Sequence, residues 1–328
     1  MQEEPTIPRT DQRYVQKVSP QPVQCVSGAS SAPVSRPQQG PWVTVWRRFL
    51  RHRLALFGML VLITLTLGTL IGPLLYQKRI DDIDFGVAMQ GPRLTHPMGT
   101  DDMGQDLLAR ILYGGRVSIA VGLTAMLIAI ILGTIVGAVA GYCGGMVDNI
   151  LMRLTDLFIA LPQLPLLLLV VYLFRDSVRR HLGPELGIFL LMVSVIGGLR
   201  WMQPARLLRA TFLSLKEKEF VEAAHAIGTP PGRLVIRHLL PNAMSPLIVA
   251  ASLGVGQAIL AESSLSFLGL GFPPDMPTWG RLLFDAKDFL ELAPHWALFP
   301  GIMIFLAVLS INYVGDGLRD ALDARKVF

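Results

Sequence analysis

Long apolar runs alternate with short polar segments along this chain, and the runs have the length that crosses a lipid bilayer. A membrane-spanning helix needs about 20 consecutive apolar residues. Because lipid offers no hydrogen-bond partners, each run must be a helix that satisfies its own backbone. The pattern therefore predicts an all-α integral membrane protein with six spans: Leu54–Tyr76, Val117–Tyr142, Ile150–Phe174, Leu186–Trp201, Ala243–Phe267 and Trp296–Val314.

Composition supports a membrane protein and sets the domain boundaries. The chain is 52% hydrophobic and only 16% charged, which excludes an ordinary soluble domain. Residues 1–41 are rich in Pro, Gln and Ser and contain no apolar run, so they are expected to form a disordered cytoplasmic tail. Residues 42–328 are expected to form one transmembrane domain. The net charge of +5 does not indicate nucleic-acid binding, because basic residues flank membrane spans for topological reasons.

The basic residues also predict the orientation of the spans. Four arginines directly precede the first span: Arg47, Arg48, Arg51 and Arg53. Basic residues are enriched on the cytoplasmic side, so the N-terminus is expected there, and six spans return the C-terminus to the same side. The polar segment 200–242 is then cytoplasmic. Three arginines between residues 175 and 180 fall on the outer side, against the rule.

The cytoplasmic segment contains a short helix signal between Glu219 and Gly228. The stretch is rich in alanine, carries glutamates in its first turn and closes with glycine. Acidic residues suit the positive N-terminal end of a helix, and glycine suits its C-terminal end. Because small alanine side chains let another surface approach closely, we expect this helix to be a docking element.

Two patterns within the spans concern packing. Gly133, Gly137 and Gly141 recur every four residues and therefore lie on one helix face, where another backbone can approach closely. The neighbour is either another helix of this chain or a second subunit. Arg153 and Asp156 are three residues apart, so they are expected to pair on one helix face.

Recognisable catalytic motifs are missing from the sequence. The phosphate-binding loop G-x-x-x-x-G-K-[ST], the zinc motif H-E-x-x-H, the C-x-x-C pair and the G-x-S-x-G elbow do not occur. The six histidines show no metal-ligand spacing. We therefore expect neither an enzyme nor a metal or nucleotide site in this chain.

The cytoplasmic segment resembles the EAA loop of ABC-importer permeases. Its pattern is Glu222-Ala223-Ala224, then Gly228, then Leu240-Pro241, with His238 where many members have isoleucine. Further motifs resemble the C-type subunits of the dipeptide/oligopeptide/nickel permease group over residues 42–328. They are His96-Pro97-Met98-Gly99-Thr100-Asp101 with Gly104-Gln105-Asp106, Ser263 to Gly271 with Trp279-Gly280, and Gly315 to Asp323. Arginine is usual in the group where Gln105 stands.

The resemblance implies a fold, a set of partners and a location. The fold would be like that of type I ABC importers, with a cytoplasmic coupling helix. The partners would be a homologous second permease in a heterodimer, two ABC ATPase subunits and an extracytoplasmic substrate-binding protein. ATP and magnesium would be bound by the ATPases, with no cofactor in this chain. The protein would lie in the bacterial inner membrane with both termini cytoplasmic, forming half of the translocation pathway.

The resemblance also implies which residues couple the permease to the ATPase. Glu222 would be the charged docking contact, Ala223 and Ala224 would allow close packing, and Gly228 would permit the turn. Apolar residues of the same helix would pack into the ATPase cleft or back onto this subunit: Phe220, Val221 and Ile227. Leu240 and Pro241 would direct the chain into the fifth span.

Two polar residues of the fifth span are candidates for a pathway or gate role, Gln257 and Glu262. An ionisable group at membrane depth indicates function by default, unless it lies at the solvated interface. Two other functional classes remain open at this point: a secondary transporter, although the spans show no clear repeat and few charges, and a membrane-embedded enzyme. The substrate is also open among dipeptides, oligopeptides, glutathione and nickel.

Overall fold

The computed structural model describes residues 41–322 of the chain. The predicted tail at residues 1–41 lies outside the described residues except for Pro41, which begins the first helix. Within residues 41–322 the secondary structure is helical, without a β-strand, which confirms the all-α prediction.

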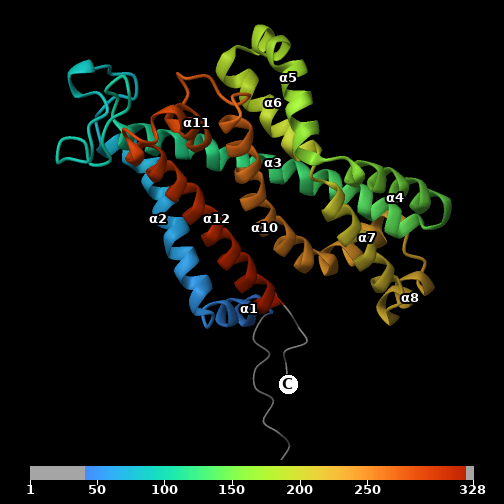
Figure 1. The fold of residues 1–328 in the computed structure, drawn as a ribbon. Coiled ribbons are helices and arrows are strands. Elements are labelled where there is room, and N and C mark those ends of the chain that lie inside the picture. The colour runs from blue at the N-terminus through green and yellow to red at the C-terminus, as the bar shows by residue number, and fades with distance from the viewer. Residues whose placement is uncertain (1–40, 323–328) are drawn as a thin grey trace, which may run out of the picture. The chain divides into compact units, whose positions relative to one another are not determined.

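Most helices follow one another with short connections, and the longer ones are the segment between α2 and α3 and the segment between α10 and α11 (Figure 1). Their bounds are α1 Pro41–Phe49, α2 Arg53–Leu75, α3 Leu107–Cys143, α4 Gly145–Ala160, α5 Gln163–Leu182, α6 Pro184–Gly198, α7 Met202–Lys216, α8 Glu219–Ala226, α9 Pro231–Leu234, a π-helix Val235–Leu239, α10 Leu240–Phe267, α11 Trp279–Ala286 and α12 Pro294–Leu322. Two short 3₁₀ turns lie at Phe85–Val87 and Lys287–Phe289.

The prediction of six spans agrees with the helices. Among the described residues, five helical runs are long and apolar enough to cross a membrane, and the bent pair α4–α5 makes a sixth if it counts as one span. The fourth span is longer than predicted, because α6 and α7 form a run over Pro184–Lys216 instead of ending at Trp201. The extension is amphipathic and buries Ala205, Leu208 and Phe212 inside the protein.

The third span is not the straight helix predicted over Ile150–Phe174. Helix α4 ends at Ala160, α5 begins at Gln163, and their axes differ by 87°. Pro162 explains the break, because proline has no backbone N–H and disfavours a helical conformation in the residue before it. Leu161 is accordingly extended, with φ −75° and ψ 136°.

The central core lies where α3, α5, α6 and α10 meet (Figure 1). Most of its buried side chains are aliphatic and come from these four helices, including Val121, Val171, Met192 and Leu265, and Phe272 of the segment between α10 and α11 completes it. In Figure 1 the segment between α2 and α3, the α5–α6 turn and α11 lie at one end of residues 41–322, and α1, α8 and the end of α12 lie at the other. We call these the α11 end and the α8 end.

The glycine face of α3 packs within this chain, against α7. A Cβ atom on Gly133 would lie 2.6 Å from Pro204 Cβ, and one on Gly137 would lie 2.5 Å from the carbonyl oxygen of Ala205. Contacts this short do not occur between real side chains and backbone, so both positions require glycine. Of the two neighbours left open by the sequence, the structure places a helix of the same chain against this face.

Replacing Gly137 by alanine is expected to destabilise the protein although alanine favours helices. The added methyl group must push α7 away from α3, and overpacking of this kind costs about 1–3 kcal/mol. Gly68→Ala is the matched control, because a Cβ on this helical glycine meets nothing within 4 Å. Thermal unfolding in detergent should give a lower midpoint for Gly137→Ala than for Gly68→Ala, and equal midpoints would contradict the packing.

Two ion pairs join α4 to α7, and neither is the predicted Arg153–Asp156 pair. Asp148 accepts from Arg209, with 2.5 Å between Oδ2 and Nη2. Asp156 pairs with Arg206. The prediction was wrong because α7 lies beside α4 and offers an arginine from across the helix pair, which the local spacing on α4 does not reveal.

Candidate functional site

Helix α8 is attached to the rest of the protein by one apolar face. Val221 is 1% exposed and Ala224 is 5% exposed. Both pack in a cluster with residues of α7, α9, the π-helix and α10: Leu208, Phe212, Leu234, Leu239 and Ala243. Burial on one face gives a helix of eight residues a defined position that its own hydrogen bonds could not provide.

The other predicted coupling residues of α8 lie on its exposed side. Glu222 and Ala223 are exposed, Phe220 is 40% exposed and Ile227 at the helix end is 83% exposed. The two alanines of the motif therefore differ, because Ala224 packs inside this chain and Ala223 faces outward. Large apolar side chains next to an acidic one on an exposed helix are typical of a protein-binding surface.

Gly228 ends α8 in the way the sequence predicts. Its φ of 77° lies in the left-handed region, which glycine adopts without steric cost. The amide of Gly228 donates to the carbonyl of His225 at 2.9 Å, and the amide of Thr229 donates to that of Ala224 at 3.0 Å. This pair of bonds is a Schellman motif, which terminates the helix and turns the chain towards α9.

Leu240 and Pro241 stand at the start of α10, where the sequence predicts the return into the fifth span. The preceding five residues, Val235–Leu239, form a π-helix, and the amide of Leu240 donates to the carbonyl of Val235. Proline cannot donate to a carbonyl one turn earlier, so a local widening before Pro241 accommodates it. The helical run from α9 to α10 is thus continuous over Pro231–Phe267. Helix α8 is therefore joined, through the turn at Gly228, directly to the end of a membrane span.

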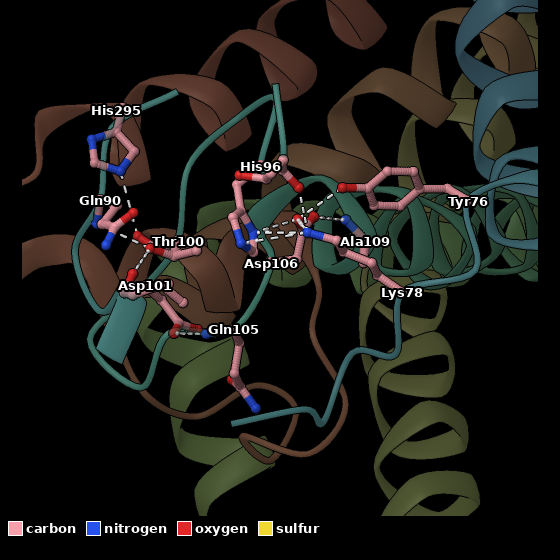
Figure 2. Close-up of polar contacts among 12 residues, drawn as sticks. Tyr76, Lys78, Gln90, His96, Thr100, Asp101, Gln105, Asp106, Ala109 and His295 are labelled. Atoms are coloured by element: carbon pink, nitrogen blue, oxygen red, sulfur yellow. Dashed lines mark hydrogen bonds and ion pairs between the residues drawn. The ribbon is translucent and has the colours of Figure 1, made fainter. Parts of the chain in front are cut away.

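At the α11 end, the segment between α2 and α3 is organised around Asp106 (Figure 2). One carboxylate oxygen accepts from the amide of Ala109 and caps the N-terminus of α3. The other accepts from the hydroxyl of Tyr76 at 2.8 Å, and Lys78 and His96 lie 3.3 Å and 2.9 Å from it. Burial, and then the hydrogen bond and charge of Asp106, raise the pKa of Tyr76, so its hydroxyl remains a donor at physiological pH.

Asp101 organises the adjacent part of the same segment. Its carboxylate accepts from the amides of Met103 and Gln105 and pairs with Arg110 of α3. Arg110 also donates to Gln105 Oε1 and lies 3.8 Å from Asp285 of α11. The glutamine that departs from the usual arginine is therefore an acceptor in this network. The polar motif residues hold the segment in shape and join it to α3 and α11.

A cavity of about 550 Å³ lies between the α4–α5 break, the α6–α7 turn and α10. Gln257, a predicted pathway residue, borders it together with Gln163, Gln203 and Arg200. Arg200 is not among the predicted site residues, and it falls where the predicted fourth span, Leu186–Trp201, overlaps the predicted cytoplasmic segment 200–242. The available signal in the sequence was a single basic residue directly after an apolar run that ends in Gly197-Gly198-Leu199.

Glu262, the other predicted pathway residue, does not border this cavity. It is fully buried between α3 and α10, and it accepts from Ser118 at 3.1 Å and from Ser266 at 2.7 Å. Ser118 in turn accepts from the amide of Trp279 at the start of α11. Glu262 therefore joins three helices, and it is not at the solvated interface.

The chain is similar to known transport proteins over most of its length. Residues 129–327 match the family described as "Binding-protein-dependent transport system inner membrane component", and residues 40–92 match the N-terminal transmembrane domain of oligopeptide transport permease C. An oligopeptide transport system permease protein of Escherichia coli K12 is 41% identical over 87% of this chain and 91% of its own length. A dipeptide transport system permease protein of Alkalihalophilus pseudofirmus is 39% identical over 87% of this chain and 90% of its own length.

Another relative and a solved structure complete the comparison. A glutathione transport system permease protein of Pectobacterium atrosepticum is 36% identical over 87% of this chain and 91% of its own length. The inward-facing MetNI methionine ABC transporter has a chain with a TM-score of 0.50 and 17% identity, covering 65% of this chain and 96% of that chain, which supports the fold alone. The chain therefore belongs to the family of binding-protein-dependent inner membrane transport components, as a multi-pass ABC-importer permease and not a catalytic enzyme.

Proposed function

We propose that this chain is the permease subunit of an ATP-driven importer for dipeptides or oligopeptides. It forms half of the translocation pathway and pairs with a homologous second permease, and an extracytoplasmic binding protein delivers the peptide. Similarity over 87% of the chain to a dipeptide and an oligopeptide permease is the observation that carries this proposal. The glutathione permease relative adds glutathione, itself a short peptide, as a second candidate substrate.

The coupling to ATP hydrolysis takes place through α8. Each of two ATPase subunits binds ATP and magnesium, and one of them receives the exposed face of α8 with Phe220, Glu222 and Ala223. The buried face, Val221 and Ala224, anchors the helix to α7 and α10. Movement of the ATPase is thereby passed to the run from α9 to α10, which enters the membrane directly. With α8 in the cytoplasm, α1 and the end of α12 lie on the same side, in agreement with the arginines before α2.

Purification of the tagged chain in mild detergent, followed by mass spectrometry, tests this assembly. We expect a second permease and one or two ATPases with phosphate-binding loops to be recovered with it. Proteoliposomes that contain the complex should then take up a dipeptide in the presence of ATP and the binding protein. Recovery of the chain alone, in a detergent that keeps a known ABC complex intact, would contradict the proposal.

A further inference from the structure

Two interruptions of the membrane helices meet at one cavity. Leu161 and Pro162 separate α4 from α5, and Leu199–Trp201 form a turn between α6 and α7. Residues of both interruptions border the cavity of about 550 Å³. The turn at Leu199–Trp201 lies inside one continuous run, but the break at Leu161 and Pro162 bends the chain by 87°. Such a break at membrane depth persists only where it is buried in protein or lines a polar cavity, and broken helices mark substrate sites in other transporters. The cavity is therefore a candidate part of the translocation pathway.

Three polar side chains define the centre of this region. Gln163, Arg200 and Gln257 border both the large cavity and a neighbouring cavity of about 200 Å³. They come from α5, from the α6–α7 turn and from α10, so the fold brings together residues far apart in the sequence. The side-chain Nε2 of Gln163 donates to the backbone carbonyl of Leu199 at 3.3 Å, which ties the two helix interruptions to each other. Much of the remaining wall is apolar and includes Met126 and Phe158.

Arg200 brings a positive charge into this region without a partner of opposite charge. Within residues 41–322, its guanidinium forms no ion pair, and its buried Nε has no hydrogen-bond partner. None of the described residues that line the two cavities is acidic. A cation at membrane depth is costly unless it is compensated, and such residues are functional by default. The guanidinium is thus available to an anionic ligand that enters the cavity.

We propose that Arg200 binds the C-terminal carboxylate of the transported peptide, while Gln163 and Gln257 bind its backbone. This inference rests on the proposed function in peptide import. A carboxylate is common to all unmodified peptides, and its planar geometry fits the two parallel donors of a guanidinium. Glutamine amides both donate and accept, so they match backbone C=O and N–H groups whatever the peptide sequence. The apolar wall accommodates side chains without selecting among them.

The test measures uptake of two forms of one peptide, the free acid and the form with an amidated C-terminus. Uptake is measured in proteoliposomes that contain the complete importer and its binding protein. The pair is chosen so that the isolated binding protein binds both forms within about twofold, which places any remaining selectivity in the permease. The wild-type complex should take up the free acid faster than the amide. Arg200→Gln should reduce uptake of the acid by at least about tenfold, because tenfold is the factor expected for the loss of one charge-assisted hydrogen bond and the guanidinium supplies two. Uptake of the amide should stay within about twofold of the wild-type rate. Arg200→Lys keeps the positive charge but not the paired donors, so its uptake of the acid should lie between that of the wild type and that of Arg200→Gln.

Arg206→Gln is the matched control, because it also removes an arginine from this region but one whose partner is Asp156. It should leave the ratio of acid to amide uptake unchanged. A wild-type ratio near one, or an equal loss of both substrates in Arg200→Gln, would overturn the inference. Loss of the second permease from the purified Arg200→Gln complex would overturn it too, by assigning the guanidinium to the subunit interface. Wild-type complex that takes up neither peptide would instead contradict the proposed function.

Discussion

Glu222→Lys is expected to reduce peptide uptake by at least about tenfold while the protein still inserts into the membrane. Glu222 is exposed on α8 and, within the described residues, its carboxylate forms no ion pair or hydrogen bond, so its charge is not required for folding. Reversal of a charge at a docking surface replaces an attraction by a repulsion, and loss of a buried interfacial charge pair costs about 2–5 kcal/mol. Uptake of a labelled dipeptide, measured beside ATP hydrolysis by the purified complex, checks the result.

Glu217→Lys provides the matched control for this experiment. Glu217 is also exposed, and its replacement by lysine changes the charge by the same amount. It lies at the end of α7, before α8 begins. Membrane fractions should contain equal amounts of both variants. Equal uptake by the Glu222→Lys and Glu217→Lys variants would contradict the assignment of Glu222 as a docking contact.

Glu262→Ala is expected to destabilise the complex strongly. The substitution removes the acceptor used by the hydroxyls of Ser118 and Ser266 and leaves a void between α3 and α10. Unsatisfied buried donors cost about 1–3 kcal/mol, and the void adds to this cost. Glu262→Gln should remain close to wild type, because the amide has the same size and serine hydroxyls can either donate or accept. Apparent melting temperatures in detergent measure the difference.

Uptake by the Glu262→Gln variant then separates packing from gating. A gate that needs the carboxylate predicts lost uptake in a stable complex, whereas a packing role alone predicts normal uptake. Ser264→Ala controls for substitution in the same helix, because its hydroxyl bonds only within α10, to the carbonyl of Leu260. A Glu262→Ala complex as stable as Ser264→Ala would contradict the packing role.

The membrane spans could be predicted from the sequence because lipid imposes a local rule. An apolar run of sufficient length must be helical in lipid, whatever surrounds it, so five spans were located near their actual positions. The break in the third span at Pro162 was missed because the apolar run continues unchanged across it. Proline has no backbone N–H and is a local helix breaker, so the sequence did contain a signal for this break. The fourth was cut short at Trp201, because an amphipathic continuation such as α7 has too many charges to resemble a span.

The α8 segment, which we propose as the coupling element, shows the same division between local and tertiary information. Gly228 terminates α8 as predicted, since a left-handed turn after a helix depends on the residue itself. By contrast, the difference between Ala223 outside and Ala224 inside follows from the position of α7 and α10 against α8. Eight residues carry too few turns for hydrophobic periodicity to identify the buried face.

The sequence by itself determined the membrane class, the helical spans, the short α8 helix and the family resemblance, because these depend on residues close together in the chain. Only the tertiary structure decided that the α3 glycines pack on α7, that Glu262 is held by Ser118, and that Arg200 faces a cavity with Gln163 and Gln257. These contacts join residues up to 144 positions apart. Local periodicity carries no information about such pairs, since they form only when the helices have packed.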